Sequence, residues 1–105
     1  MNDWSEAVLD IVERVPAGRA TTYGLVAEAV RALTGRGSAR QVGTLMATQG
    51  AAVPWWRVVR ADGSLPEHLR DRATEHYTAE RTPVRPSGSV DLDHAVWDPL
   101  EDTHA

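Results

Sequence analysis

Two stretches in the first third of the chain repeat apolar residues with the period of an amphipathic helix. The first helix is predicted over 3–15, and the second over 22–34, with Thr22 as its N-cap and Gly35 just past its end. The apolar face of the first comprises Trp4, Ala7, Val8, Ile11, Val12 and Val15. That of the second comprises Leu25, Val26, Ala29, Val30 and Leu33.

A third helix is predicted immediately after the turn "GRG" at 35–37. Ser38 is its expected N-cap, and Gln41 completes an S-x-x-Q capping box before the segment "ARQVGTLMATQ". Two short helices joined by a short turn that contains glycine are typical of a helix-turn-helix.

The second half of the chain predicts smaller elements. The segment "WRVVRADGSL" reads as two short strands around an Asp-Gly turn, which would form a β-hairpin wing. A polar helix is expected over 66–81, with Pro66 at its first position. Trp97 is expected to fold back onto the body, and a tail from about 99 to 105 is expected to be disordered. We therefore predict one mainly α domain over 1–105, a winged helix-turn-helix with a small hairpin wing.

Charge is distributed unevenly along the chain. The formal net charge is −4, composed of −4 over 1–13, +6 over 14–60 and −6 over 61–105. A basic middle between acidic ends indicates a surface that binds a polyanion. The alternative is a basic face that acidic neighbours balance in the folded protein.

The composition excludes several chemistries. The chain contains no cysteine, so it has no disulfide, no thiolate metal site and no thiol nucleophile. The four histidines show no spacing typical of a metal site, and we expect no cofactor. No apolar run reaches the roughly 20 residues of a membrane span, and the first residues do not resemble a signal peptide. A cytoplasmic protein, associated with the nucleoid when bound to DNA, is the expectation.

Two side chains break local rules. Arg40 lies in the first turn of the third helix, where the helix dipole disfavours a cation by roughly 0.3–1 kcal/mol. It is either a solvated arginine or one directed at DNA. Tyr23 is either a core residue or a contact to a backbone phosphate. Gly43 weakens its helix by about 1 kcal/mol relative to alanine, which indicates tight packing or close approach to a ligand.

Three stretches, "GRATTYGLVAEAV", "SARQVGTLM" and "VPWWRVV", together resemble the DNA-binding domain of the O6-alkylguanine-DNA alkyltransferases. That family carries a tyrosine at the start of one helix, an arginine at the start of the recognition helix and a Pro-Cys-His-Arg-Val signature. The spacings agree, with 17 residues from Tyr23 to Arg40 and 15 from Arg40 to Trp55. The closing "VDLDHAVWDP" resembles the alkyltransferase-like branch, in which tryptophan replaces the reactive cysteine.

The signature reads Pro54-Trp55-Trp56-Arg57-Val58 in this chain. Trp55 stands at the cysteine position and Trp56 at the histidine position. Alkyl transfer to protein needs a thiolate and a nearby base, and neither indole can accept an alkyl group. We therefore predict a protein that is not an enzyme.

The resemblance implies a non-enzymatic sensor of O6-alkylguanine in duplex DNA. Its third helix would dock in the minor groove, Arg40 would replace a rotated nucleotide and Tyr23 would turn the 3′ phosphate. The implied DNA-binding residues are Tyr23, Ser38, Ala39, Arg40, Gln41, Gly43 and Thr44. The implied lesion pocket is walled by Pro54, Trp55, Trp56, Arg57 and Val58, with the alternative that Trp56 packs behind it. A monomer is expected, without membrane contact, that flags the lesion for nucleotide excision repair proteins.

Other readings stay open at this point. The chain could be a winged-helix transcription regulator that reads sequence in the major groove, or a protein-interaction module that uses the tryptophan pair. The pair could also be a core cluster. The segment after "ADGS" lacks the glycine-rich loop of the alkyltransferases, which predicts an open pocket tolerant of larger adducts.

Overall fold

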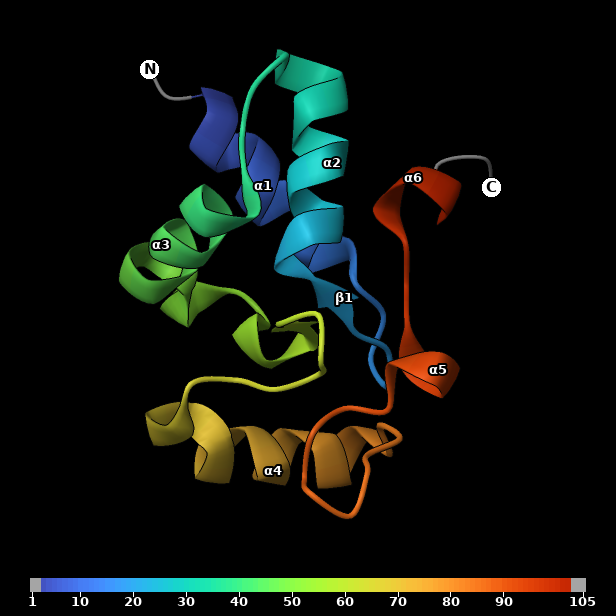
Figure 1. Ribbon diagram of the computed structural model, residues 1–105. Coiled ribbons are helices and arrows are strands. Elements are labelled where there is room, and N and C mark those ends of the chain that lie inside the picture. Colours follow the sequence, from blue (N-terminus) through green and yellow to red (C-terminus); the bar gives the residue numbers. More distant parts are fainter. Residues whose placement is uncertain (1–2, 103–105) are drawn as a thin grey trace.

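Three helices form the amino-terminal half of the protein (Figure 1). The computed structural model describes the backbone of residues 3–102 and the side chains of 4–101. Helix α2 (Tyr23–Thr34) packs against both α1 (Asp3–Arg14) and α3 (Ala39–Gln49). None of the helices in this described part combines the length and apolar character needed to cross a lipid bilayer.

The predicted caps of the helix-turn-helix are confirmed. The hydroxyl of Thr22 accepts a hydrogen bond from the Leu25 N–H at 3.1 Å, and Gly35 ends α2 with a φ of 80°. The hydroxyl of Ser38 accepts from the Gln41 N–H at 3.2 Å and so caps α3. These bonds satisfy backbone donors that a helix leaves unpaired at its start.

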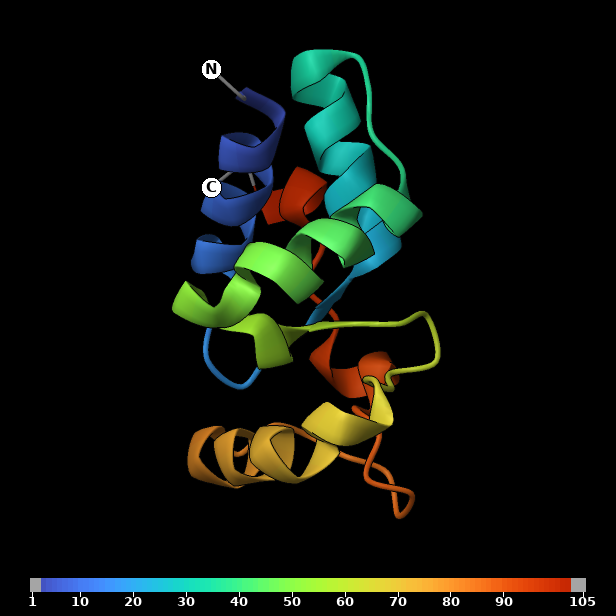
Figure 2. The same ribbon diagram turned by 90° about the vertical axis from the view of Figure 1, so that its left-hand side faces the viewer.

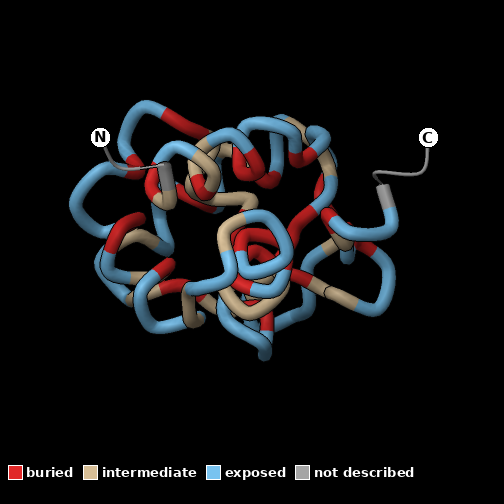
Figure 3. Tube along the Cα trace, turned by 90° about the horizontal axis from the view of Figure 1, so that it is seen from above, coloured by how far each residue is buried: buried red, intermediate tan, exposed pale blue. Residues whose placement is uncertain are grey.

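The apolar faces of the three helices meet in one core, and Figure 3 shows the buried positions on the inside of the chain trace. Most of the predicted apolar positions are buried, but Leu33 in the last turn of α2 is 70% exposed. Trp97 is 4% exposed and joins this core, as predicted. A second, smaller cluster contains Ala20, Val59, Leu65, Ala73, Tyr77, Val90 and Ala95.

The predicted hairpin wing is wrong in its strand pairing. Trp55–Arg57 forms a short 3-10 turn, η2, and the strand β2 (Val58–Val59) follows it. β2 pairs in parallel with β1 (Thr21–Thr22), with Thr21 opposite Val58, so the sheet joins segments far apart in the sequence. Val58 and Val59 are fully buried, and a parallel partner buries both faces better than an exposed hairpin would.

The remaining elements lie below and beside the helix-turn-helix. The 3-10 turn η3 (Glu67–Leu69) leads into α4 (Arg70–Glu80), close to the predicted helix over 66–81. Figures 1 and 2 show α4 running beneath α3. The short helix α5 (Leu92–Ala95) precedes Trp97.

The first four residues of the expected tail are helical. Residues Pro99–Asp102 form a helical turn, α6, that packs against α2. The ring of Pro99 is fully buried there, which explains why this part of the expected tail is ordered. Residues 103–105 of that tail lie outside the described residues.

The turn that orients α3 provides a test of the fold. Gly35 and Gly37 have φ values of 80° and 125°, but a Cβ added at Gly37 would lie 2.5 Å from Trp4 Nε1, whereas one at Gly35 meets nothing within 4 Å. We expect G35A to lower the free energy of unfolding by about 1 kcal/mol. G37A should lose about 1–3 kcal/mol more, because it adds the overlap with the indole. Urea unfolding measures both; equal losses would contradict the packing of Trp4 on this turn.

Candidate nucleic-acid interface and base pocket

The outer face of α3 presents most of the residues predicted to bind DNA. Ala39, Arg40, Gln41 and Thr44 are all exposed. Arg40, Gln41 and Thr44 line one side of a shallow groove, whose other wall includes Trp4 of α1. The first turn of α3 therefore offers a cation and two polar side chains to a ligand outside the protein.

Gly43 lies on the side of α3 that faces the rest of the site. A Cβ built at this position meets no atom within 4 Å, so internal packing does not require glycine here. Gly43 instead lines a cavity next to α3. Of the two explanations for this helix-weakening residue, close approach of a ligand fits the structure.

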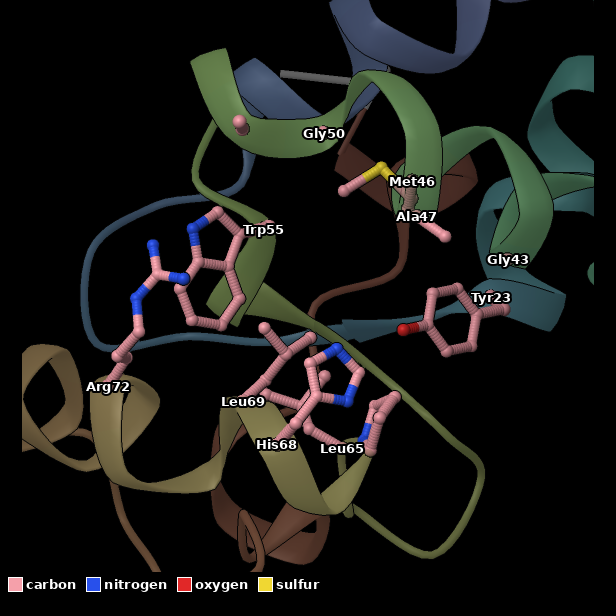
Figure 4. A pocket seen from close by; sticks show the side chains of 12 residues that line it. Tyr23, Gly43, Met46, Ala47, Gly50, Trp55, Leu65, His68, Leu69 and Arg72 are labelled. Atoms are coloured by element: carbon pink, nitrogen blue, oxygen red, sulfur yellow. The ribbon is translucent and has the colours of Figure 1, made fainter.

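The cavity beside α3 has a volume of about 250 Å³ and a mostly apolar lining. Figure 4 shows its walls: the indole of Trp55 on one side and the ring of Tyr23 on the other, with Met46 above. Leu65, His68 and Leu69 close it from below. Its volume is just under the roughly 300–1,000 Å³ of pockets for drug-sized ligands, which fits a single flat group such as a base.

Tyr23 contributes both an aromatic face and a hydroxyl to this cavity. The first residue of α2, it packs against the helical core, and its hydroxyl points into the cavity (Figure 4). Burial raises the pKa of the Tyr23 phenol, although Arg60 opposes this. The hydroxyl therefore stays protonated at neutral pH and can donate a hydrogen bond.

Trp55 lies where the two apolar clusters meet and packs against both. Its ring contacts Trp56 edge to face, with centroids 5.6 Å apart and planes at 90°. The guanidinium carbon of Arg72 lies 5.3 Å from the centroid of its ring. Trp55 is only half buried, so its indole remains available to a group that enters the cavity.

Trp56 does not line this cavity. Its ring stacks on His76 with centroids 3.5 Å apart, and its N–H donates to Glu80 Oε1 at 3.2 Å. The Tyr77 hydroxyl donates to the Trp56 carbonyl at 2.7 Å. These contacts with α4 turn Trp56 into a structural residue.

The other three residues predicted to wall the pocket, Pro54, Arg57 and Val58, do not line the cavity either. Val58 is fully buried in β2, because its side chain belongs to the helical core. Pro54 precedes the 3-10 turn and is half buried. Arg57 points to the opposite side, where its Nε donates to Glu80 Oε1 at 3.0 Å and its Nη1 donates to the Val15 carbonyl at 2.9 Å.

Glu80 joins these contacts into one network. It receives hydrogen bonds from Arg57, Trp56 and the backbone N–H of Gly18. The side chains of Arg57 and Glu80 are only 17% and 14% exposed. Burial raises the pKa of the Glu80 carboxyl, but the hydrogen bonds from these three groups outweigh it and hold that pKa below the ordinary 4.5.

Sequence reasoning missed the contribution of α4 to the site. Leu69, Arg72, His76 and Glu80 all face the tryptophan pair or the cavity beside it. They recur three or four positions apart, so they share one face of the helix. The sequence contains this spacing, but most of these residues are polar, so no apolar periodicity marks the face.

The seven arginines of the basic middle segment divide into two groups. Four donate to other groups of the protein: Arg57 to Glu80, Arg19 to the carbonyls of Ala95 and Val96, Arg31 to the Gly37 carbonyl and Arg60 to the Ser64 hydroxyl. Arg14, Arg36 and Arg40 are exposed and take no part in these contacts. Among the described side chains of residues 4–101, no cluster of three or more His, Asp or Glu could hold a metal ion.

Fold and site together define a helix-turn-helix protein whose second helix borders an aromatic-walled cavity. The family described as the DNA-binding domain of 6-O-methylguanine DNA methyltransferase matches residues 3–81. The chain therefore belongs to this family, as an alkyltransferase-like protein.

Similar proteins agree with this assignment. A DNA base-flipping protein of Escherichia coli (strain K12) is 33% identical over 102 residues, which cover 91% of this chain and 75% of that protein. One from Vibrio parahaemolyticus is 29% identical over 104 residues, covering 94% and 100%. The crystal structure of S. pombe Atl1 in complex with damaged DNA containing O6-carboxymethylguanine has a TM-score of 0.73 at 26% identity, covering 92% and 96%.

The Glu80 network predicts a pH-dependent stability. Because the native pKa of Glu80 is lowered, its stabilisation is complete above the ordinary value of 4.5 and is lost as the pH falls through the native pKa. We expect E80Q to lower the free energy of unfolding by about 2–3 kcal/mol at pH 7. The difference in this free energy between the wild type and E80Q should become smaller below pH 4.5. Urea unfolding between pH 3 and 7 measures this.

The matched control is E75Q, which removes an exposed carboxylate from the same helix. It should stay within about 0.5 kcal/mol of the wild type at every pH. A loss in E80Q that does not change with pH would show that the charge of Glu80 is not what holds the network.

Proposed function

We propose that this protein is a non-enzymatic sensor that binds O6-alkylguanine in duplex DNA. α3 enters the minor groove, and the modified nucleotide rotates out of the stack into the cavity between Tyr23 and Trp55. Arg40 fills the space that the nucleotide leaves. The observation that carries this proposal is the placement of an exposed arginine and an aromatic-walled cavity on one helix, α3.

The energetics favour a damaged base over an intact one. Extruding a nucleotide costs a few kcal/mol and is easiest for a damaged or mispaired base. Stacking on an aromatic side chain returns about 1–3 kcal/mol. An O6-alkyl group both weakens normal pairing and adds apolar surface for Trp55, Met46 and Leu69 to cover. A cation in the minor groove gains from its strong negative potential.

The chain binds the lesion without repairing it. It contains no cysteine, and Trp55 occupies the place where a thiolate would attack the alkyl group. The position after it holds Trp56, whose N–H donates to Glu80. The bound complex then serves as the signal that brings nucleotide excision repair proteins to the site, in keeping with the family resemblance.

The decisive experiment is a fluorescence-anisotropy titration with two duplexes of one sequence that differ by a single O6-methylguanine. We expect tighter binding to the modified duplex, and weaker binding to both as salt rises, because phosphate contacts release counterions. Mass spectrometry of the protein after incubation should show no added methyl group. Equal affinity for the two duplexes would discard lesion sensing and favour a sequence-specific regulator.

Trp55 should control the preference for the lesion rather than the affinity for DNA. The variant W55L keeps apolar bulk between the two core clusters but removes the aromatic face. We expect its affinity for the O6-methylguanine duplex to fall by about 1–2 kcal/mol, with little change for the unmodified duplex. The same titration measures both. An equal loss on both duplexes would assign Trp55 a structural role.

A further inference from the structure

Arg72 is the one arginine among the described residues that line the cavity. It extends from the first turns of α4 and lays its guanidinium against the ring of Trp55, 5.3 Å from the ring centroid (Figure 4). No aspartate or glutamate is among those lining residues. The cavity therefore has a positive group beside the indole, and its floor is apolar apart from His68.

The guanidinium of Arg72 is uncommitted in this structure. Among residues 4–101, no salt bridge and no hydrogen bond joins it to another side chain or carbonyl. Arg57, the other arginine beside the tryptophan pair, differs sharply, because Glu80 and the Val15 carbonyl occupy its donors. One cation near the pair is neutralised by the fold, and the other is exposed at the edge of the cavity, where it contacts only the ring of Trp55.

A stacked guanidinium can still bind an anion. It contacts an aromatic ring through its face, while its five N–H donors point outward in its plane and match the two oxygens of a carboxylate. Arg72 can therefore remain on Trp55 and donate to a group that enters the cavity. Without Arg72, a carboxylate buried against the apolar side chains of the cavity would have no partner and would pay a large desolvation penalty.

We propose that Arg72 makes this pocket selective for O6 adducts that end in a carboxylate, such as carboxymethyl. The inference rests on the proposed function, because it assumes that the modified guanine enters the cavity. S. pombe Atl1 has been crystallised with damaged DNA containing O6-carboxymethylguanine, so an alkyltransferase-like pocket can meet an adduct of this class. The ion pair with Arg72 then decides between a charged adduct and a neutral one of equal size.

The test uses two adducts of the same shape, O6-carboxymethylguanine and its neutral amide O6-carbamoylmethylguanine, together with unmodified guanine in the same duplex. We expect the wild type to bind the carboxymethyl duplex about tenfold more tightly than the carbamoylmethyl duplex, because charge-assisted hydrogen bonds are about twice as strong as neutral ones. The ratio between these two affinities is the readout, since both adducts impose the same shape.

R72Q should bring this ratio to within about twofold of one, since glutamine keeps the helix propensity but removes the charge. The matched control is R14Q, which removes one positive charge from an exposed position at the end of α1, outside the cavity lining. R14Q should keep the tenfold ratio. A ratio that survives in R72Q, or that falls equally in R14Q, would overturn the role of Arg72.

Failure of this inference is distinguishable from failure of the proposed function. If the wild type binds both adducts equally, and both more tightly than guanine, lesion sensing stands and charge selection is wrong. If the wild type binds neither adduct more tightly than guanine, the proposed function falls and the selectivity falls with it.

Discussion

The partly buried ion pair between Arg57 and Glu80 is the contact on which the arrangement of the site depends. The carboxylate of Glu80 accepts hydrogen bonds not only from Arg57 but also from the indole N–H of Trp56 and the backbone N–H of Gly18. One carboxylate thereby connects the loop after α1, the tryptophan pair and α4. A buried pair of this kind contributes modestly to net stability, but removing one partner leaves the other uncompensated, so the geometry is strongly enforced.

That network gives the two neighbouring tryptophans different tasks. Glu80 holds the indole N–H of Trp56 and His76 stacks on its ring, so Trp56 does not line the cavity. Trp55 contacts Trp56 edge to face on one side. Its remaining surface borders the cavity and Arg72. A rigid aromatic wall is useful to a protein that binds a flat base, because little conformational freedom remains to be lost on binding.

The helix-turn-helix and the cavity share α3. In the proposed function, this shared helix links groove contact with base binding. The first turn of α3 exposes Arg40 outward, while Gly43 and Met46 face the cavity. A helix docked in a groove therefore brings the cavity to the same stretch of DNA. Glycine at position 43 weakens the helix without relieving any internal contact, which is the pattern expected where a ligand must come close.

The sequence by itself determined the three amino-terminal helices, their caps at Thr22 and Ser38, and the absence of a thiol nucleophile. Those features depend on local periodicity, capping chemistry and composition, which a single chain displays directly. Only the tertiary structure decided that β2 pairs with β1, because pairing between residues 37 positions apart leaves no local signal. It also decided which signature residues face the cavity. Val58 does not face the cavity because it is buried in the core, and Arg57 does not because it pairs with Glu80. The arginine that lines the cavity is Arg72 of α4.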